Sequence, residues 1–132
     1  MGVAGWIFVG VVTVLVAAAG LQIAIGLRAK AITGKPLPAD LPEPLRTTLG
    51  TGLHLVYVWS PTCGPCKVMA PTVDALVREG APVIKLDASR DPETCMKLGV
   101  MGTPTTLVVR DGVVADVMMG MRREADLRSA LG

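Results

Sequence analysis

The sequence predicts an α/β domain with a mixed sheet of about four strands flanked by helices, preceded by one membrane-spanning helix. Two observations carry this prediction. Residues 5–27 form one apolar run without a charged side chain. From residue 53 onward, short β-branched segments alternate with segments of helical periodicity in the order β-α-β-α-β-β-α. This order is typical of a parallel βαβ unit extended by an antiparallel hairpin, with helices on both faces of the sheet.

The apolar run reads GWIFVGVVTVLVAAAGLQIAIGL, and Gln22 is its only strongly polar side chain. As a helix it is about 34 Å long, enough to cross a hydrocarbon core of ~30 Å. A cleaved secretory signal is the alternative, because Ala17–Ala19 resemble a cleavage site. However, no basic segment precedes the run, and the run continues past these alanines. We therefore expect a single-pass anchor in the cell membrane, with the lipid bilayer around residues 5–27.

The segment 28–46, RAKAITGKPLPADLPEPLR, changes character sharply. It has four prolines between residues 36 and 44, which predict an extended, semi-rigid linker. Arg28, Lys30 and Lys35 follow the apolar run, whereas the terminal amine is the only positive charge before it. The positive-inside rule then favours the cytoplasmic side for the domain, with the periplasmic side as the alternative.

Residues 47–132 form the predicted domain. Met69, Val73, Leu76 and Val77 recur at helical spacing, and Asp111-Gly112 is a strong turn signal between two β-branched segments. The expected elements are a strand over 53–60, a helix over 63–80, a strand over 82–89, a short helix over 91–99, a hairpin over 105–120 and a helix over 122–132. A further short helix is possible over 43–50. The net charge of +2 and the scarcity of aromatic residues speak against a nucleic acid partner.

The chemistry of the domain centres on Cys63 and Cys66, separated by Gly64 and Pro65. Cys63 is expected at the first turn of the helix over 63–80, where unpaired N–H groups and the helix dipole favour a thiolate. Cys66, one turn on, is close enough to attack a mixed disulfide on Cys63. A structural disulfide would close a loop of only two residues and add little stability.

A zinc site is the other alternative for this pair of cysteines. Zinc would need two more ligands, and only Cys95 and His54 are of the usual type. Their spacing matches no common zinc pattern, so no metal is expected.

The chain resembles the thioredoxin family from about residue 53 to residue 132. The resemblance rests on Trp59, CGPCK at 63–67, Pro71, KLD at 85–87, GVMGTPT at 99–105, the Asp-Gly hairpin and Gly120. It implies a thioredoxin-like fold and thiol–disulfide oxidoreductase activity, with the redox-active Cys63–Cys66 disulfide and no other cofactor. It assigns Cys63 as the nucleophile, Cys66 as the resolving cysteine, Trp59, Gly64, Pro65, Lys67 and Lys85 as supporting residues, and Thr103 and Pro104, joined by a cis bond, as the substrate-binding pair.

Two residues depart from the family pattern. Tyr57 stands where thioredoxins commonly have a buried aspartate that serves the resolving thiol. A phenol is a poor base at neutral pH, and Lys85, which matches a buried lysine of the family, would lose its carboxylate partner. Thr62 stands where many thioredoxins have a tryptophan, so an apolar contact is missing there. The usual first strand is also not evident, which predicts a trimmed, four-stranded version of the fold.

The favoured function is a membrane-tethered oxidoreductase that reduces protein disulfides by dithiol–disulfide exchange. Its expected partners are disulfide-containing protein clients and a reductase or membrane electron donor. The Gly-Pro pair between the cysteines resembles that of reducing thioredoxins. The alternatives are a redox-inactive or metal-delivering docking module of the same fold, and a periplasmic reductant for cytochrome c or cofactor maturation.

Overall fold

The structure is a computed structural model that describes residues 2–132, including all of their side chains except those of residues 28–30. It separates into two units, one ending at Ala31 and one spanning Ile32–Gly132. Because Arg28 and Lys30 lie among the three undescribed side chains, the charges used to predict the membrane side lie partly outside the described residues.

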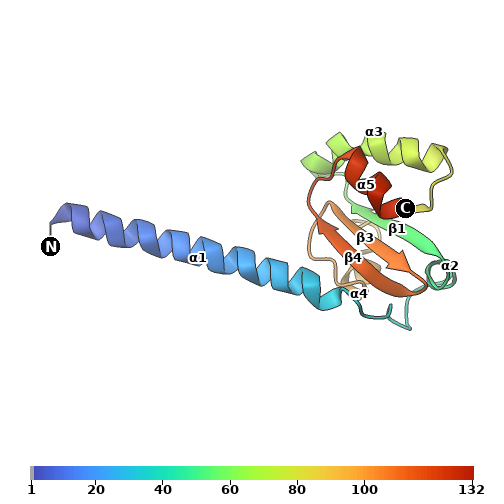
Figure 1. The fold of residues 1–132 in the computed structure, drawn as a ribbon, viewed down its shortest axis with the longest axis horizontal. Coiled ribbons are helices and arrows are strands. Elements are labelled where there is room, and N and C mark those ends of the chain that lie inside the picture. Colours follow the sequence, from blue (N-terminus) through green and yellow to red (C-terminus); the bar gives the residue numbers. More distant parts are fainter. Residues whose placement is uncertain (1) are drawn as a thin grey trace. The chain divides into compact units, whose positions relative to one another are not determined.

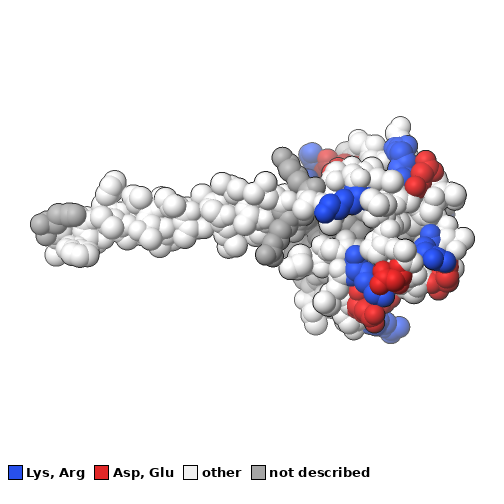
Figure 2. Space-filling view, turned by 90° about the horizontal axis from the view of Figure 1, so that it is seen from below, with Lys and Arg blue, Asp and Glu red and all other residues white. Residues whose placement is uncertain are grey.

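The first unit is the helix α1, Val3–Ile32. Residues Val3–Leu27 are long and apolar enough to cross a membrane, with a mean hydropathy of 2.4 and no buried residue in the most apolar window. Figure 2 shows no charged side chain along the described part of this segment. An N-terminal signal sequence would have the same length and composition.

The second unit is built on a four-stranded sheet in the order β2-β1-β3-β4. Figure 1 shows three of these strands, β1, β3 and β4. The strands are β1, Leu53–Trp59, β2, Val83–Asp87, β3, Thr105–Arg110, and β4, Val113–Met119. The central strand β1 pairs with β2 in parallel and with β3 antiparallel, and β3 pairs with β4 antiparallel. This confirms the predicted mixed sheet of four strands.

The hairpin between β3 and β4 turns at Asp111 and Gly112, as the sequence predicts. Both residues have positive φ, 50° and 77°, which a two-residue hairpin turn requires. The Asp111 side chain accepts a hydrogen bond from the Gly52 amide at 2.7 Å, and the Gly112 amide donates to the Leu49 carbonyl at 2.9 Å. These bonds tie the turn to the segment that leads into β1.

Helices cover both faces of the sheet, so the core has two halves. The helices are α2, Leu45–Leu49, α3, Gly64–Arg78, α4, Pro92–Lys97, and α5, Glu124–Leu131. One half-core packs α3 and α5 against the face that carries Leu55, Tyr57 and Val108. The other packs residues of α2 and α4 against Val56 and Val58. Val77, expected to face inward on α3, is instead 42% exposed, because the inward face is already formed by Met69, Val73 and Leu76.

The segment predicted as a linker packs onto this domain from Ile32 onward. The Gly34 amide donates to the Val114 carbonyl at 2.7 Å, the Val114 amide donates to the Lys35 carbonyl at 3.0 Å, and Pro36 forms a bridge with Val113. Leu41 is 4% exposed and belongs to the α2 and α4 half-core. The prolines keep the segment extended, and an extended chain can pair with an edge strand on one side and cover that edge.

Candidate functional site

Cys63 lies where β1 ends and α3 begins. It is the N-cap residue of α3, with extended backbone angles, and Pro65 occupies the first turn. Its sulfur accepts a hydrogen bond from the Cys66 amide at 3.2 Å. A sulfur in this position faces the unpaired amides and the positive end of the helix dipole, and both favour the thiolate over the thiol.

Cys63 and Cys66 are joined by a disulfide, with their Cα atoms 5.2 Å apart. Their exposed fractions are 8% and 3%, so Cys63 is the more accessible of the two. Gly64 and Pro65 between them are exposed. Both cysteines are largely buried, with Cys63 at the terminus of α3 and Cys66 one turn inside the helix.

Three loops meet beside this disulfide because β1 and β3 are antiparallel. The end of β1 lies next to the start of β3, where Val58 pairs with Thr105. The loop that precedes β3 contains Thr103 and Pro104, and the bond between them is cis, as the resemblance implies. Pro104 is buried and its carbonyl accepts a hydrogen bond from the Gly120 amide at 2.9 Å, which brings in the loop after β4.

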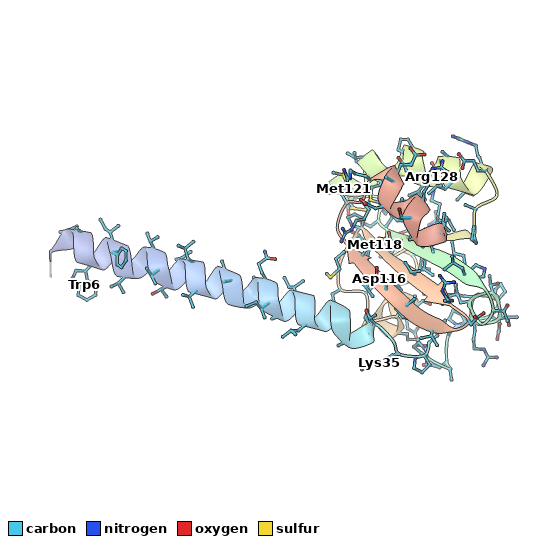
Figure 3. All side chains as sticks on the ribbon, in the orientation of Figure 1. Trp6, Lys35, Asp116, Met118, Met121 and Arg128 are labelled. Atoms are coloured by element: carbon cyan, nitrogen blue, oxygen red, sulfur yellow. A yellow bond between two sulfur atoms is a disulfide. The ribbon has the colours of Figure 1, made fainter. Side chains whose placement is uncertain are left out.

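The rim of the site carries exposed apolar side chains that the sequence did not single out. Met101, in the loop before β3, is 72% exposed, and Met121, in the loop after β4, is 59% exposed. Figure 3 shows Met121 in that loop. Thr62 is exposed, so the missing tryptophan leaves a polar side chain directly before Cys63. The sequence does contain a signal for both methionines. Met101 lies two residues before Thr103, and Met121 directly follows Gly120.

Tyr57 lies on β1 beneath the first turns of α3. It is 2% exposed, and its hydroxyl donates a hydrogen bond to the carbonyl of Cys66 at 3.4 Å. Burial, and to a lesser extent the negative charge of Asp74, raises the pKa of this phenol above its ordinary value. Tyr57 therefore stays protonated and acts as a hydrogen-bond donor beside Cys66.

Lys85 differs from its predicted role. It was expected to be buried and to lack a carboxylate partner, and both expectations are wrong. Its side chain is 37% exposed on the edge strand β2, and its Nζ lies 2.8 Å from the carboxylate of Asp74 on α3. The same Nζ lies 5.5 Å from the centre of the Trp59 ring, within cation–π range. The carboxylate partner of Lys85 is therefore Asp74 on α3, two turns after Cys66, and not a residue at position 57.

The remaining candidates are one lysine beside the disulfide and two residues on other elements of the domain. Lys67 is exposed on α3, and its amide donates to the Cys63 carbonyl at 3.4 Å. Cys95 is a free thiol, 5% exposed, in the half-core with α4, where burial raises its pKa. His54 is half-buried at the start of β1. No group of three or more His, Cys, Asp or Glu residues in the described part of the chain is placed to hold a metal ion.

Comparison with known proteins gives a consistent result for the second unit. The thioredoxin family model matches residues 45–132. The thioredoxin of Bacillus subtilis (strain 168) is 38% identical over 80 residues, which cover 58% of this chain and 77% of that protein. The thioredoxin of Staphylococcus aureus is 38% identical over 84 residues, covering 61% and 81%.

Solved structures agree with these sequence relatives. A point mutant of the thioredoxin from Halobacterium salinarum NRC-1 superposes with a TM-score of 0.63 at 25% identity, covering 74% of this chain and 88% of that one. Fasciola hepatica thioredoxin superposes with a TM-score of 0.59 at 31% identity, covering 67% and 86%. With a matching family model, a four-stranded sheet of the same fold and a disulfide-bonded CxxC pair at the start of α3, this chain belongs to the thioredoxin family and is a thiol–disulfide oxidoreductase.

Proposed function

We propose that this protein is a membrane-tethered reductase of protein disulfides, in which Cys63 is the nucleophile and Cys66 the resolving cysteine. The observation that carries the proposal is the asymmetry of the pair. The Cys63 sulfur caps α3 and accepts a hydrogen bond from the Cys66 amide, while Cys66 is buried one turn further on. Only the first sulfur combines access to a client with a helix terminus that stabilises its thiolate.

The reaction proceeds in two exchanges of sulfur partners. The Cys63 thiolate attacks one sulfur of a client disulfide, and the other client sulfur leaves with the electron pair and takes up a proton. Cys66 then loses its proton and attacks the Cys63 sulfur, which releases the second client thiol and forms the Cys63–Cys66 disulfide. Two electrons have passed to the client, so a reductase or a membrane electron donor must return the protein to the dithiol.

Client binding is assigned to the loop before β3. Thr103 is half-buried next to the cis bond, and Thr105 at the start of β3 already pairs with Val58 and Met119. Main-chain groups of Thr103 would bind an extended client segment, which favours recognition by backbone more than by sequence. The exposed side chains of Met101 and Met121 provide an apolar, adaptable surface on either side of such a segment.

The membrane tether is the segment Val3–Leu27. Its length and apolar character support a retained span. Lys35 and the two basic residues at positions 28 and 30 follow it, and this positive charge supports a domain on the cytoplasmic side. A reducing compartment would also keep the dithiol form available for reaction.

The test is the reduction of a protein disulfide by the purified full chain in detergent, with dithiothreitol as the electron source. Insulin is a suitable client, because reduction of its interchain disulfides precipitates the B chain. We expect turnover by the parent and none by Cys63→Ser. Reduced Cys66→Ser, mixed with insulin after dithiothreitol is removed, is expected to form a trapped mixed disulfide. Cys95→Ala is the matched control and is expected to keep parental turnover. Equal residual activity in Cys63→Ser and Cys66→Ser would contradict the assigned roles.

A further inference from the structure

One buried hydroxyl group, on the face of the sheet that α3 covers, has no hydrogen-bond partner among the described residues. Thr106 on β3 is 1% exposed, and its Oγ1 forms no hydrogen bond with any described residue. The neighbouring Thr105 differs, because its hydroxyl donates to the Gly102 carbonyl at 2.7 Å. Buried polar groups in native proteins are nearly always paired with protein or with ordered water, so an orphaned hydroxyl indicates a water site or a functional role.

The hydroxyl lies on the Cys66 side of the sheet. Thr106 is directly opposite Tyr57 in the β1–β3 pair, and Val108, two residues on, is in the half-core covered by α3 and α5. Residues directly opposite in an antiparallel pair have Cβ atoms about 4.5–5.5 Å apart. Tyr57 in turn contacts the Cys66 carbonyl. Thr106 and Tyr57 are therefore neighbouring buried residues on the face of the sheet that α3, the helix carrying Cys66, covers.

Tyr57 cannot act as the acceptor of the proton that leaves the Cys66 thiol. Burial raises the pKa of its phenol, and its hydrogen is directed at the Cys66 carbonyl. Cys66 is 3% exposed, so bulk water has little access to its sulfur. Charged groups that face this half of the core are Asp74 on α3, Lys85 on β2 and Asp116 on β4, opposite Val108. Arg122, in the loop before α5, and Asp126, on α5, line the same pocket as Asp116. Asp74 and Lys85 are bound to each other, and Figure 3 shows Asp116 on β4.

We propose that Thr106 is a positioning residue for the resolving step, and that its hydroxyl holds a water molecule which takes the proton from the Cys66 thiol. This inference rests on the proposed function of the cysteine pair. The Cys66 proton passes to the water and on to solvent. The Cys66 thiolate then attacks the Cys63 sulfur, the bond between Cys63 and the client breaks, and the client thiolate leaves and is protonated from solvent.

The two exchange steps can be timed separately with 5,5′-dithiobis(2-nitrobenzoate). The reduced full chain, with Cys95→Ala to remove the third thiol, is mixed in excess over this reagent. Attack by Cys63 releases one thionitrobenzoate, and resolution by Cys66 releases the second. Because thionitrobenzoate leaves without a proton, the second phase reports the deprotonation and attack of Cys66 alone.

We expect Thr106→Val to slow the second phase at pH 7 by about tenfold, less than the ~10²–10⁴-fold that a general base contributes in full, because Thr106 positions the water and is not itself the base. The first phase should change less than twofold. The difference should shrink as the pH rises, because hydroxide then removes the Cys66 proton directly. Thr106→Ser keeps the hydroxyl and should restore the second phase.

The controls separate this role from a structural one. Thr94, 3% exposed on α4 in the opposite half-core, is a buried threonine of the same kind, and Thr94→Val should leave both phases unchanged. Thr106→Val should fold with a Tm close to that of the parent, because the hydroxyl that it removes has no partner among the described residues. A second phase that is unchanged, slowed equally at every pH, or not restored by serine would overturn the inference. A parent with no first phase would contradict the proposed function itself.

Discussion

Tyr57 illustrates how a single residue reshapes the region around the disulfide. Its ring fills the space between β1 and α3, and its hydroxyl bonds to the Cys66 carbonyl. A carboxylate at this position would be a potential base for Cys66. A phenol of raised pKa serves instead as a fixed donor, so the proton of the resolving thiol must leave by another route.

Tyr57→Phe tests how much that hydrogen bond contributes to the free energy of unfolding. The ring packing is retained, so we expect the free energy of unfolding to fall by only about 0.5–1.5 kcal/mol, the usual net value of one hydrogen bond. The rate of Cys63 attack should be unchanged. Urea unfolding and the two-phase thionitrobenzoate assay measure both quantities. A loss of several kcal/mol would show that the hydroxyl holds the first turn of α3 in place.

Cys95 gives a pH-dependent prediction, because burial, followed by the charges of Asp91 and Asp87, raises the pKa of its thiol. A group whose folded pKa is raised contributes stability that is complete below its unfolded pKa and is lost as the pH rises toward the folded pKa. The loss should begin near the ordinary thiol pKa of about 8.5. Urea midpoints between pH 7 and pH 10 should fall more steeply in the parent than in Cys95→Ala. Identical slopes would contradict the burial of this thiol in solution.

At the scale of elements, the sequence predicted most of the domain because its signals are local. Helical spacing, β-branched runs and the Asp111-Gly112 turn each act within a few residues. What it missed depends on contacts between distant segments. Lys85 meets Asp74 only when β2 packs beside α3, and the Thr106 hydroxyl is orphaned only when β3 pairs with β1 beneath that helix. No periodic pattern in the sequence indicates contacts between segments that are distant along the chain.

The segment before α2 yields a prediction at the same scale. Residues 34–37 cover the edge of β4, and Leu41 is 4% exposed in the core. We expect Leu41→Ala to lower the free energy of unfolding by about 2–5 kcal/mol, because it leaves a cavity. Leu37→Ala, in a half-buried side chain at the edge, should cost less. If Leu41→Ala has no effect in thermal unfolding, this segment behaves as the free linker that its prolines suggest.

At the scale of the whole molecule, the proposed membrane tether gives a testable prediction about the side of the membrane on which the disulfide lies. The test is to label Cys63 in intact cells with a membrane-impermeant thiol reagent after mild reduction. Protection until lysis is expected for a cytoplasmic domain, and labelling from outside would place it in the periplasm. Cys63→Ser should remove the signal, because Cys63 is the most exposed of the three cysteines and lies at the terminus of α3.

The docking of residues 34–37 onto β4 shortens the free chain between the apolar segment Val3–Leu27 and the domain. With Val3–Leu27 in the bilayer, the chain from Leu27 to Gly34, where hydrogen bonding to the sheet begins, can extend by at most about 25 Å. A free linker up to residue 46 would allow more than twice that range. Under the membrane tether proposed above, the domain would therefore stay in a thin layer next to the lipid surface. Clients held in that layer would meet it at a higher local concentration than freely diffusing ones.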